Sequence, residues 1–217
     1  MATSTRPAPR SPARPLRQLD DPEAFAAARR AFVDAAFVVL SRRSDLDFSV
    51  TEVVKESGLH NAAFYRVFES KDRLLLAVAE EAMQRTLETL QARVTKARDG
   101  QQAMRQWGTV LLRLAATDRS AQSIEAFALE RHRFLRRFPD AEDRLVEPVR
   151  QVLADALVQR GIATDDAHEV TNAAYELVMG QQATWIARGH RPTQREVERV
   201  ASLATRLLDT EPRCQER

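Results

Sequence analysis

Hydrophobic residues recur at intervals of three and four along most of the chain, from about residue 21 to about residue 210. That spacing places them on one face of an α-helix, whereas a half-buried β-strand would show strict alternation. No stretch combines such alternation with the clustered turn residues that bound strands. The pattern therefore predicts an all-α protein of about nine helices.

Capping residues and glycines divide this helical region into segments. Asp21-Pro22 is an N-cap followed by proline, and the helix that it opens is expected to end near Arg43. The capping boxes Ser49-Val50-Thr51-Glu52 and Thr193-Gln194-Arg195-Glu196 predict two further helix starts. Glycines that follow periodic segments are expected to close helices in the left-handed conformation: Gly58, Gly100, Gly161 and Gly189. Other helices are expected at residues 71–98, 101–117, 120–137, 139–160, with a kink at Pro148, 165–188 and 194–209.

Composition and length limit the class of protein. With 217 residues, 44% hydrophobic and 29% charged, the chain can form one large domain, or a small domain joined to a larger one. Its one cysteine, Cys214, excludes an intrachain disulfide and a multi-cysteine zinc site. No stretch approaches the roughly 18 apolar residues of a transmembrane helix, and the N-terminus has no apolar signal region, so we expect a cytoplasmic protein.

Residues 1–19 form a basic segment with closely spaced prolines, which no helix would tolerate. The segment has no acidic residue before Asp20 and carries a local charge of +4 from Arg6, Arg10, Arg14 and Arg17. It is predicted to be a disordered arm. Two interpretations stay open, because such an arm can be a plain leader or can lie along a polyanion such as DNA.

The segment from Ser49 to Leu74 has the most informative pattern. A capped helix of about eight residues leads through Gly58-Leu59-His60 into a second short helix at 61–68. The apolar residues that would hold the two helices together are Val53, Val54, Leu59, Phe64 and Phe68. This is the arrangement of a helix-turn-helix, whose second helix enters the major groove of DNA. An ordinary helical hairpin would show the same succession, so the succession alone does not decide between them.

The same segment resembles the DNA-binding domain of the TetR (tetracycline-repressor-like) family of transcriptional regulators. It follows the family's order of motifs without a gap at Ser49-Val50, Glu52-Val53, Gly58-Leu59, Ala62-Ala63-Phe64-Tyr65, Phe68 and Ser70-Lys71-Asp72-x-Leu74. The resemblance is strong in residues 21–80 and weaker up to 210. It implies a helix-turn-helix domain at 20–80, a ligand-binding and dimerisation domain at 81–210, and a disordered tail at 211–217.

The resemblance also implies which residues meet DNA. Tyr65 and Lys71 match residues that grip the sugar-phosphate backbone, whereas the start of the second helix would meet base edges. The full set of expected DNA-binding residues is Ser49, Thr51, His60, Asn61, Ala62, Ala63, Tyr65, Arg66 and Lys71. His60 departs from the family, which usually has a capping serine there. A cap or core role for His60 is therefore as compatible with the sequence as a base contact.

Charge is distributed unevenly along the chain. Residues 20–80 hold eight basic and eleven acidic residues, a net charge of −3, although the whole chain has +2. A DNA-binding domain of that balance needs well-placed cations, and the arm would bring the N-terminal unit to +1. We therefore hypothesise that the arm, residues 6–17, contributes to the affinity for DNA.

Residues 81–217 show no catalytic motif and no metal-ligand spacing, so we expect no enzymatic activity, cofactor or metal. By resemblance, this region should hold a pocket for a small, largely apolar effector. The candidate lining residues are Trp107, Gly108, Phe127, Phe134, Tyr175, Met179, Gln182 and Trp185. Plain core packing would explain the aromatic residues equally well.

The last two helices carry apolar stripes that predict a dimer interface. Its candidate residues are Val170, Ala174, Leu177, Gln181, Val197, Val200, Ala201, Ala204 and Leu208. Two such helices from each of two chains would form a four-helix bundle around a two-fold axis, although the stripes could also pack only within one chain. The resulting hypothesis is a dimeric repressor that binds a palindromic operator and is released by its effector. A helical adaptor protein with a purely structural helix-turn-helix is the alternative, followed by an all-α enzyme.

Overall fold

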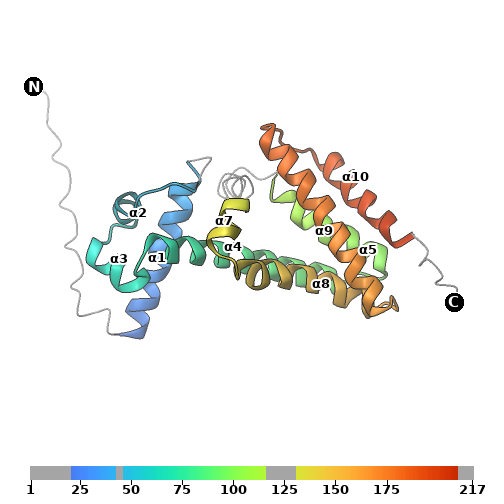
Figure 1. Cartoon of the computed structure of the whole chain (residues 1–217), viewed down its shortest axis with the longest axis horizontal. Helices are drawn as coiled ribbons and strands as arrows, with labels where there is room; N and C mark the ends of the chain where they lie inside the picture. The colour runs from blue at the N-terminus through green and yellow to red at the C-terminus, as the bar shows by residue number, and fades with distance from the viewer. Residues whose placement is uncertain (1–20, 43–45, 116–130, 210–217) are drawn as a thin grey trace, which may run out of the picture. The chain divides into compact units, whose positions relative to one another are not determined.

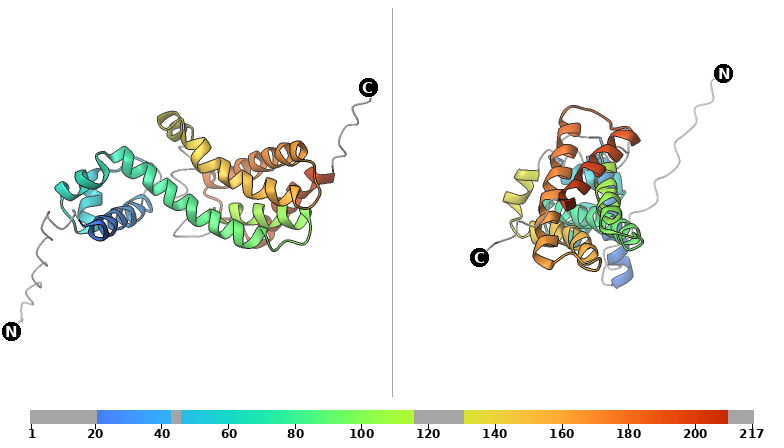
Figure 2. Two further views of the ribbon diagram at one scale, coloured as in Figure 1. Left: turned by 90° about the horizontal axis from the view of Figure 1, so that it is seen from below. Right: turned by 90° about the vertical axis from the view of Figure 1, so that its right-hand side faces the viewer.

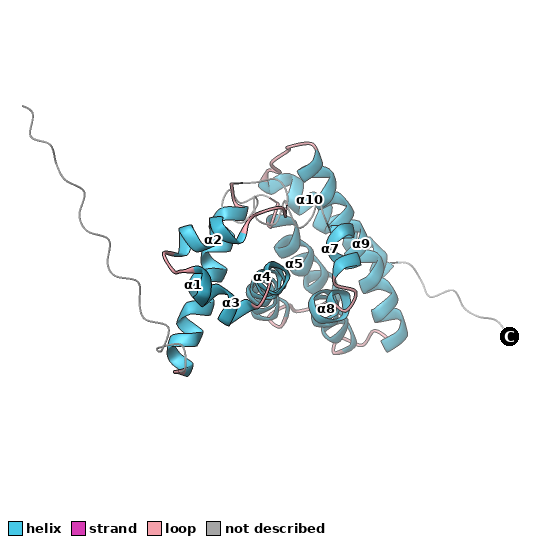
Figure 3. Cartoon of the chain, turned by 60° about the vertical axis from the view of Figure 1, so that its left-hand side comes forward, coloured by secondary structure: helices cyan, strands magenta, loops and turns pink. Residues whose placement is uncertain are grey.

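The computed structural model describes residues 21–42, 46–115 and 131–209 (Figure 1, with further views in Figure 2). Within these ranges every regular element is helical, and Figure 3 shows helices and loops without a strand. The prediction of an all-α protein is confirmed by nine α-helices in the described ranges. None of these helices is long and apolar enough to cross a membrane. The predicted arm and the tail at 211–217 lie outside the described residues.

The chain divides into two compact units. Among the described residues, the first unit combines 21–39 with 48–75, and the second combines 40–42, 46–47, 76–115 and 131–209. Helix α4, Lys71–Val94, begins in the first unit and continues into the second. One continuous helix therefore belongs to both.

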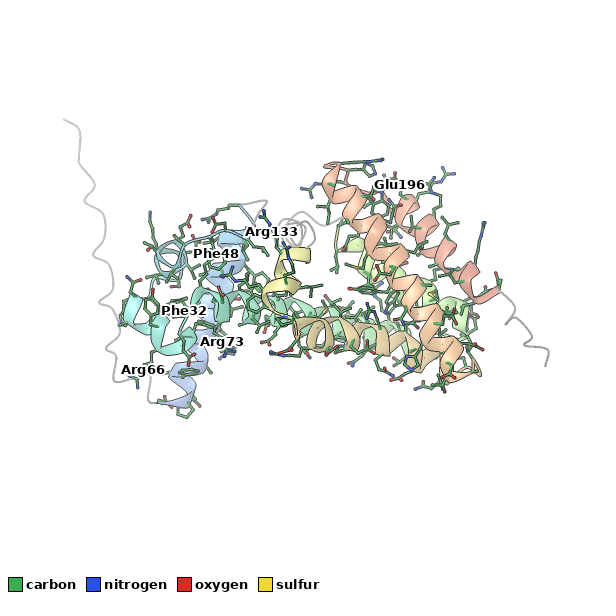
Figure 4. The ribbon with its side chains drawn as sticks, viewed as in Figure 1. Phe32, Phe48, Arg66, Arg73, Arg133 and Glu196 are labelled. Atoms are coloured by element: carbon green, nitrogen blue, oxygen red, sulfur yellow. The ribbon has the colours of Figure 1, made fainter. Side chains whose placement is uncertain are left out.

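The first unit contains α1 (Pro22–Leu40), α2 (Val50–Ser57), α3 (Asn61–Phe68) and the start of α4. Its core is aromatic. Phe32, labelled in Figure 4, and Phe64 are fully buried and meet edge to face, with ring centroids 5.4 Å apart. The ring centroid of Phe68 lies 6.2 Å from that of Phe32. Such edge-to-face contacts add to the burial of the rings and fix how α1 and α3 pack.

The second unit contains the rest of α4 and the helices that follow it along the chain. These elements are α5 (Gly100–Arg113), α7 (Arg131–Arg137), a π-helical turn (Glu142–Val146), α8 (Glu147–Val158), α9 (Thr164–Ala187), α10 (Gln194–Ala204) and a 3₁₀ turn (Thr205–Asp209). Helix α5 packs against α8, α9 and α10, and α8 packs along α9 (Figures 1 and 2). The core centres on Trp107, which is fully buried and donates its indole N–H to the Val149 carbonyl oxygen over 2.9 Å.

Most predicted helix boundaries are confirmed to within a few residues. Both capping boxes are present, and Gly58, Gly161 and Gly189 have positive φ. Gly100 was expected to close a helix, and that expectation is wrong. It is the first residue of α5, because the Asp99 carboxylate accepts the backbone N–H of Gln102 over 2.7 Å and so caps α5.

Two long predicted helices are shorter in the structure. Helix α4 ends at Val94 rather than near Arg98, and the guanidinium of Arg160 donates to the Ala97 carbonyl oxygen in the turn that follows. The helix expected at 139–160 is divided into the π-helical turn and α8, which has Pro148 in its first turn. Proline lacks the N–H that a continuous helix would use there. Of the helix expected at 120–137, residues 120–130 lie outside the described residues.

Candidate DNA-binding surface and ligand cavity

The turn between α2 and α3 is built by local interactions. Gly58 adopts the left-handed conformation with φ of 69°, which most other residues adopt only with strain. His60 then caps α3, because its backbone is extended and its Nδ1 accepts the backbone N–H of Ala63 over 3.0 Å. His60 therefore takes the capping role that the sequence analysis left open. Since Nδ1 accepts a hydrogen bond, the neutral ring carries its hydrogen on Nε2, which can act as a donor.

The outer face of α3 is polar and exposed. Asn61, Ala62, Tyr65 and Arg66 are all solvent-exposed, and Figure 4 shows Arg66 on the outside of the helix. The side chain of Tyr65 is 56% exposed, while its ring packs edge to face on a neighbouring phenylalanine. Helices of this type offer such a face to DNA.

Ala63 does not belong to that outer face. It is 3% exposed and lies on the same side of α3 as Phe64 and Phe68. The expectation that the side chain of Ala63 is among those that meet DNA is therefore corrected. The helical period places Ala63 against the core, and only Ala62 of the two alanines is presented to solvent.

The remaining expected DNA-binding residues flank α3. Ser49 is exposed and its hydroxyl is engaged with Glu52, donating to Oε2 over 2.8 Å and accepting the Glu52 backbone N–H over 3.2 Å. Thr51 is exposed on α2. Lys71 opens α4, and its Nζ lies 4.9 Å from the centroid of the Phe48 ring. That contact holds the ammonium near the helix N-terminus, where phosphate binding is favoured.

A cavity of about 150 Å³ lies within the second unit. Its walls come from α4, α5, α7, the π-helical turn, α8 and α9, and they are almost entirely aliphatic and aromatic. Four residues expected from the sequence line it: Phe134, Tyr175, Met179 and Gln182. None of the lining residues in the described part of the chain is charged.

Gln182 is the most deeply buried polar side chain of this cavity, with 1% exposure. Its Nε2 donates to the Leu111 carbonyl oxygen over 2.8 Å, near the C-terminal end of α5. Thr86 also lines the cavity, and its hydroxyl donates to the Ala82 carbonyl oxygen of its own helix. The polar groups of the lining are thus few and held in place.

Comparison with known proteins connects this architecture to a family. Residues 26–78 match the family described as bacterial regulatory proteins, tetR family. The helix-turn-helix region of the chain therefore matches the TetR family. Over 55 residues it is also 46% identical to an uncharacterized HTH-type transcriptional regulator of Haemophilus influenzae. That aligned segment covers 25% of this chain and 27% of the relative.

Solved structures share the fold of this chain along most of its length. A TetR-family regulator of Mesorhizobium loti has a TM-score of 0.70 at 15% identity, with 85% of this chain and 96% of that one covered. The regulator FadR of Bacillus subtilis, solved with stearoyl-CoA, has a TM-score of 0.64 at 14% identity, with 83% and 97% covered. At these identities the likeness concerns the fold.

Three residues expected to line the pocket are not part of the cavity lining. The indole N–H of Trp107 is hydrogen-bonded to the Val149 carbonyl oxygen. Trp185 is 6% exposed, and its ring centroid lies 6.4 Å from that of His190. Gly108 lies against α10, where an added Cβ would be 3.7 Å from the Ala201 Cα atom. These residues belong to the packed core, the alternative that the sequence left open. Phe127 lies outside the described residues.

The sequence analysis did not identify several small or aliphatic residues that form the cavity walls. They are Ala79, Ala82 and Met83 of α4, together with Ala141, Leu145 and Val146 near the π-helical turn. Residues of this kind at helical spacing look the same whether they face a core or a cavity. No sequence signal distinguished them.

The apolar residues of α10 that were predicted to form a dimer interface are buried within the chain itself. Val197, Val200, Ala201 and Ala204 are at most 7% exposed, and α10 packs against α5. The expectation that these side chains meet a partner is therefore corrected, because they already fill the core of their own unit. Ala174 of α9 is likewise fully buried.

Other residues of the predicted interface do reach the surface. Leu177 on α9 is 40% exposed, and Val170, Gln181 and Leu208 are partly buried. Leu203 on α10, which the sequence analysis did not select, is 43% exposed. These residues keep the outer faces of α9 and α10 available.

The start of α10 is held by a charged capping box. The backbone N–H and the hydroxyl of Thr193 both donate to Glu196, and these bonds hold the pKa of the Glu196 carboxyl below its ordinary value. His190 adds to the effect, with its Nε2 3.1 Å from Glu196 Oε1. Figure 4 labels Glu196 on this helix.

Proposed function

We propose that this protein is a dimeric TetR-family transcriptional repressor of the cytoplasm, which binds a palindromic DNA operator and is released by a small, largely apolar effector. The observation that carries the proposal is that α4 contributes residues both to the helix-turn-helix unit and to the cavity wall. Its first residues belong to the helix-turn-helix unit, and Ala79, Ala82, Met83 and Thr86 of the same helix line the cavity. A ligand that moves these residues would move a rigid element of the DNA-binding unit.

An ion pair provides a second connection between α4 and the cavity wall. Glu80 of α4 forms an ion pair with Arg144 of the π-helical turn, and the neighbouring residues Leu145 and Val146 are part of the cavity wall. A ligand bound against that turn would act on α4 through the same attachment. It would shift the equilibrium between two positions of α4 by its difference in affinity for them.

The DNA contacts in the proposal come from the exposed face of α3 and its flanks. Asn61, Ala62 and Arg66 would read base edges, while Tyr65 and Lys71 would bind phosphates. Ser49, Thr51 and the arm residues Arg6, Arg10, Arg14 and Arg17 would add backbone contacts. A two-fold dimer would place two such helices about 34–36 Å apart, the repeat of the major groove.

The effector in the proposal is a small molecule bound in the cavity. FadR of Bacillus subtilis, which shares the fold, was solved with stearoyl-CoA, and this supports a ligand-binding role for the second unit. The uncharged, apolar lining supports an effector that is itself largely apolar.

Selection from a pool of randomised duplexes, followed by mobility-shift measurement, tests the proposal. We expect enrichment of one palindromic sequence, and we expect Tyr65→Phe combined with Lys71→Ala to weaken binding to all sequences alike. Arg195→Ala, which removes an exposed arginine of α10, is the matched control and should leave binding unchanged. Failure to enrich any sequence would refute DNA recognition.

The contribution of the arm needs a separate experiment. Deletion of residues 1–18 removes four arginines and should lower both the affinity and the slope of its dependence on salt. An unchanged affinity together with an unchanged slope would remove the arm from the proposal.

A further inference from the structure

We infer that the cavity binds a neutral molecule of about the size of one aromatic ring that carries one hydrogen-bond donor, and that Gln182 receives this donor. A phenol has this chemistry. The inference deepens the proposed function, because the occupant would be the effector, but binding itself is measurable without DNA.

The volume of the cavity sets the size of the ligand. It holds about 150 Å³, the volume of engineered apolar cavities that stay dry and bind benzene. A stearoyl chain has about three times as many carbon atoms as benzene, whereas one aromatic ring matches this volume. A single substituted ring fills the space without forcing the helices apart.

The lining sets the charge of the ligand. The described lining residues are aliphatic, aromatic or uncharged polar, and Gln182, Thr86 and Tyr175 are the ones with polar side-chain atoms. A carboxylate or phosphate placed among them would lose its hydration without gaining a cation. The nearby guanidinium of Arg150 is directed at the Tyr175 ring, 4.6 Å from its centroid, and also approaches Glu147 and Glu176.

Gln182 sets the position of the donor. Its Nε2 is committed to the Leu111 carbonyl oxygen, and rotating the amide would instead bring two oxygens together, so the orientation is fixed. The remaining acceptor, Oε1, belongs to a side chain that lines the cavity. An amide oxygen can accept a hydrogen bond, and a ligand hydroxyl or N–H would supply the donor.

The other two polar side chains of the lining carry hydroxyl groups. The hydroxyl of Thr86 donates to the Ala82 carbonyl oxygen of its own helix. The ring of Tyr175 lies against the guanidinium of Arg150, and 4% of the residue is exposed. Gln182 is the amide of the lining and has its orientation fixed by the Leu111 carbonyl oxygen, so we assign to it the distinction between a hydroxylated ring and a plain one.

Three ring compounds of similar size test the inference on the full-length protein: phenol, toluene and benzoate. Calorimetric titration and thermal shift should rank phenol above toluene, because only phenol offers a donor, and should show no binding of benzoate. Toluene binding as tightly as phenol, or benzoate binding as tightly as either, would overturn the inference. This ranking uses the unmodified chain and does not depend on a variant that folds.

The variant Gln182→Met keeps the length of the side chain and removes the acceptor. We expect its affinity for phenol to fall about tenfold, the effect of one lost buried hydrogen bond, while its affinity for toluene is kept or rises. Gln91→Met, at an exposed position of α4 outside the cavity lining, is the matched control and should change neither. An unchanged ratio of phenol to toluene affinity in Gln182→Met would contradict the role of Gln182.

The proposed function and this inference fail in different ways. If phenol binds with the expected ranking but leaves the DNA mobility shift unchanged, the effector role is wrong and the ligand chemistry stands. If the protein shifts the mobility of its DNA as expected but does not bind phenol more tightly than toluene, the ligand chemistry is wrong and DNA recognition stands.

Discussion

Gly180 offers a test of where a partner chain binds. It lies inside α9, where glycine destabilises a helix by about 0.8–1 kcal/mol relative to alanine. A Cβ added at Gly180 would have no atom within 4 Å, so Gly180→Ala introduces no steric conflict within the chain. We therefore expect this variant to raise the free energy of unfolding of the protomer by about 1 kcal/mol.

The same methyl group should weaken the dimer. Gly180 is exposed near Leu177, on the face of α9 that is available to a partner. If the partner's helix packs closely over Gly180, an added methyl overfills that contact, at a cost of typically about 1–3 kcal/mol. The dimer dissociation constant should then rise by about fivefold or more, since about 1.4 kcal/mol corresponds to a factor of ten.

Two measurements separate the effects. Urea unfolding at several protein concentrations gives the protomer stability apart from association, and sedimentation gives the dimer dissociation constant. Gly108→Ala is the matched control, because its Cβ would meet Val178 at 3.6 Å and Ala201 at 3.7 Å, both ordinary contacts inside the chain. It should stabilise the protomer without changing association. A Gly180→Ala variant that is more stable and associates as tightly as the parent would refute the placement of the interface.

Three further predictions concern single residues. Phe64→Ala removes a fully buried ring from the aromatic core and should destabilise the first unit by about 3–5 kcal/mol, seen as an earlier unfolding transition by circular dichroism. His60→Ala should cost about 1 kcal/mol by loss of the α3 cap, whereas His60→Ser should retain the stability; equal unfolding free energies for the two would contradict the capping role. The lowered pKa of Glu196 means that its capping box stabilises the fold above the ordinary pKa of glutamate and that this contribution is lost as the pH falls through the lowered value. Acid unfolding of Glu196→Gln should lack that part of the pH dependence, and identical pH profiles for the two proteins would argue against it.

Local interactions explain why much of the DNA-binding unit was predictable. The Ser49 capping box, the left-handed Gly58 and the boundaries of α3 depend on residues within a few positions of one another. The pattern of Phe64 and Phe68 likewise fixes the inner face of α3 by helical geometry alone. Ala63 was misplaced because it was read from the motif and not from that same geometry.

The cavity was only partly predictable because a helix face does not reveal what lies opposite it. The cavity is lined by four of the expected residues: Phe134, Tyr175, Met179 and Gln182. Trp107 and Trp185 also have large side chains at helical spacing, but they are packed in the core. The difference depends on which helix is the neighbour and on how completely its side chains fill the space. Neither property is local in sequence.

The sequence by itself determined most of the helices and both capping boxes, because these depend on interactions between residues that are close along the chain. Only the tertiary structure decided the use of the apolar faces. The stripe of Val197, Val200 and Ala201 is equally suited to a partner chain and to α5, and α5 covers it. Hydrophobic burial is non-directional, so periodicity predicts that a face will be covered, and the packing of distant helices decides what covers it.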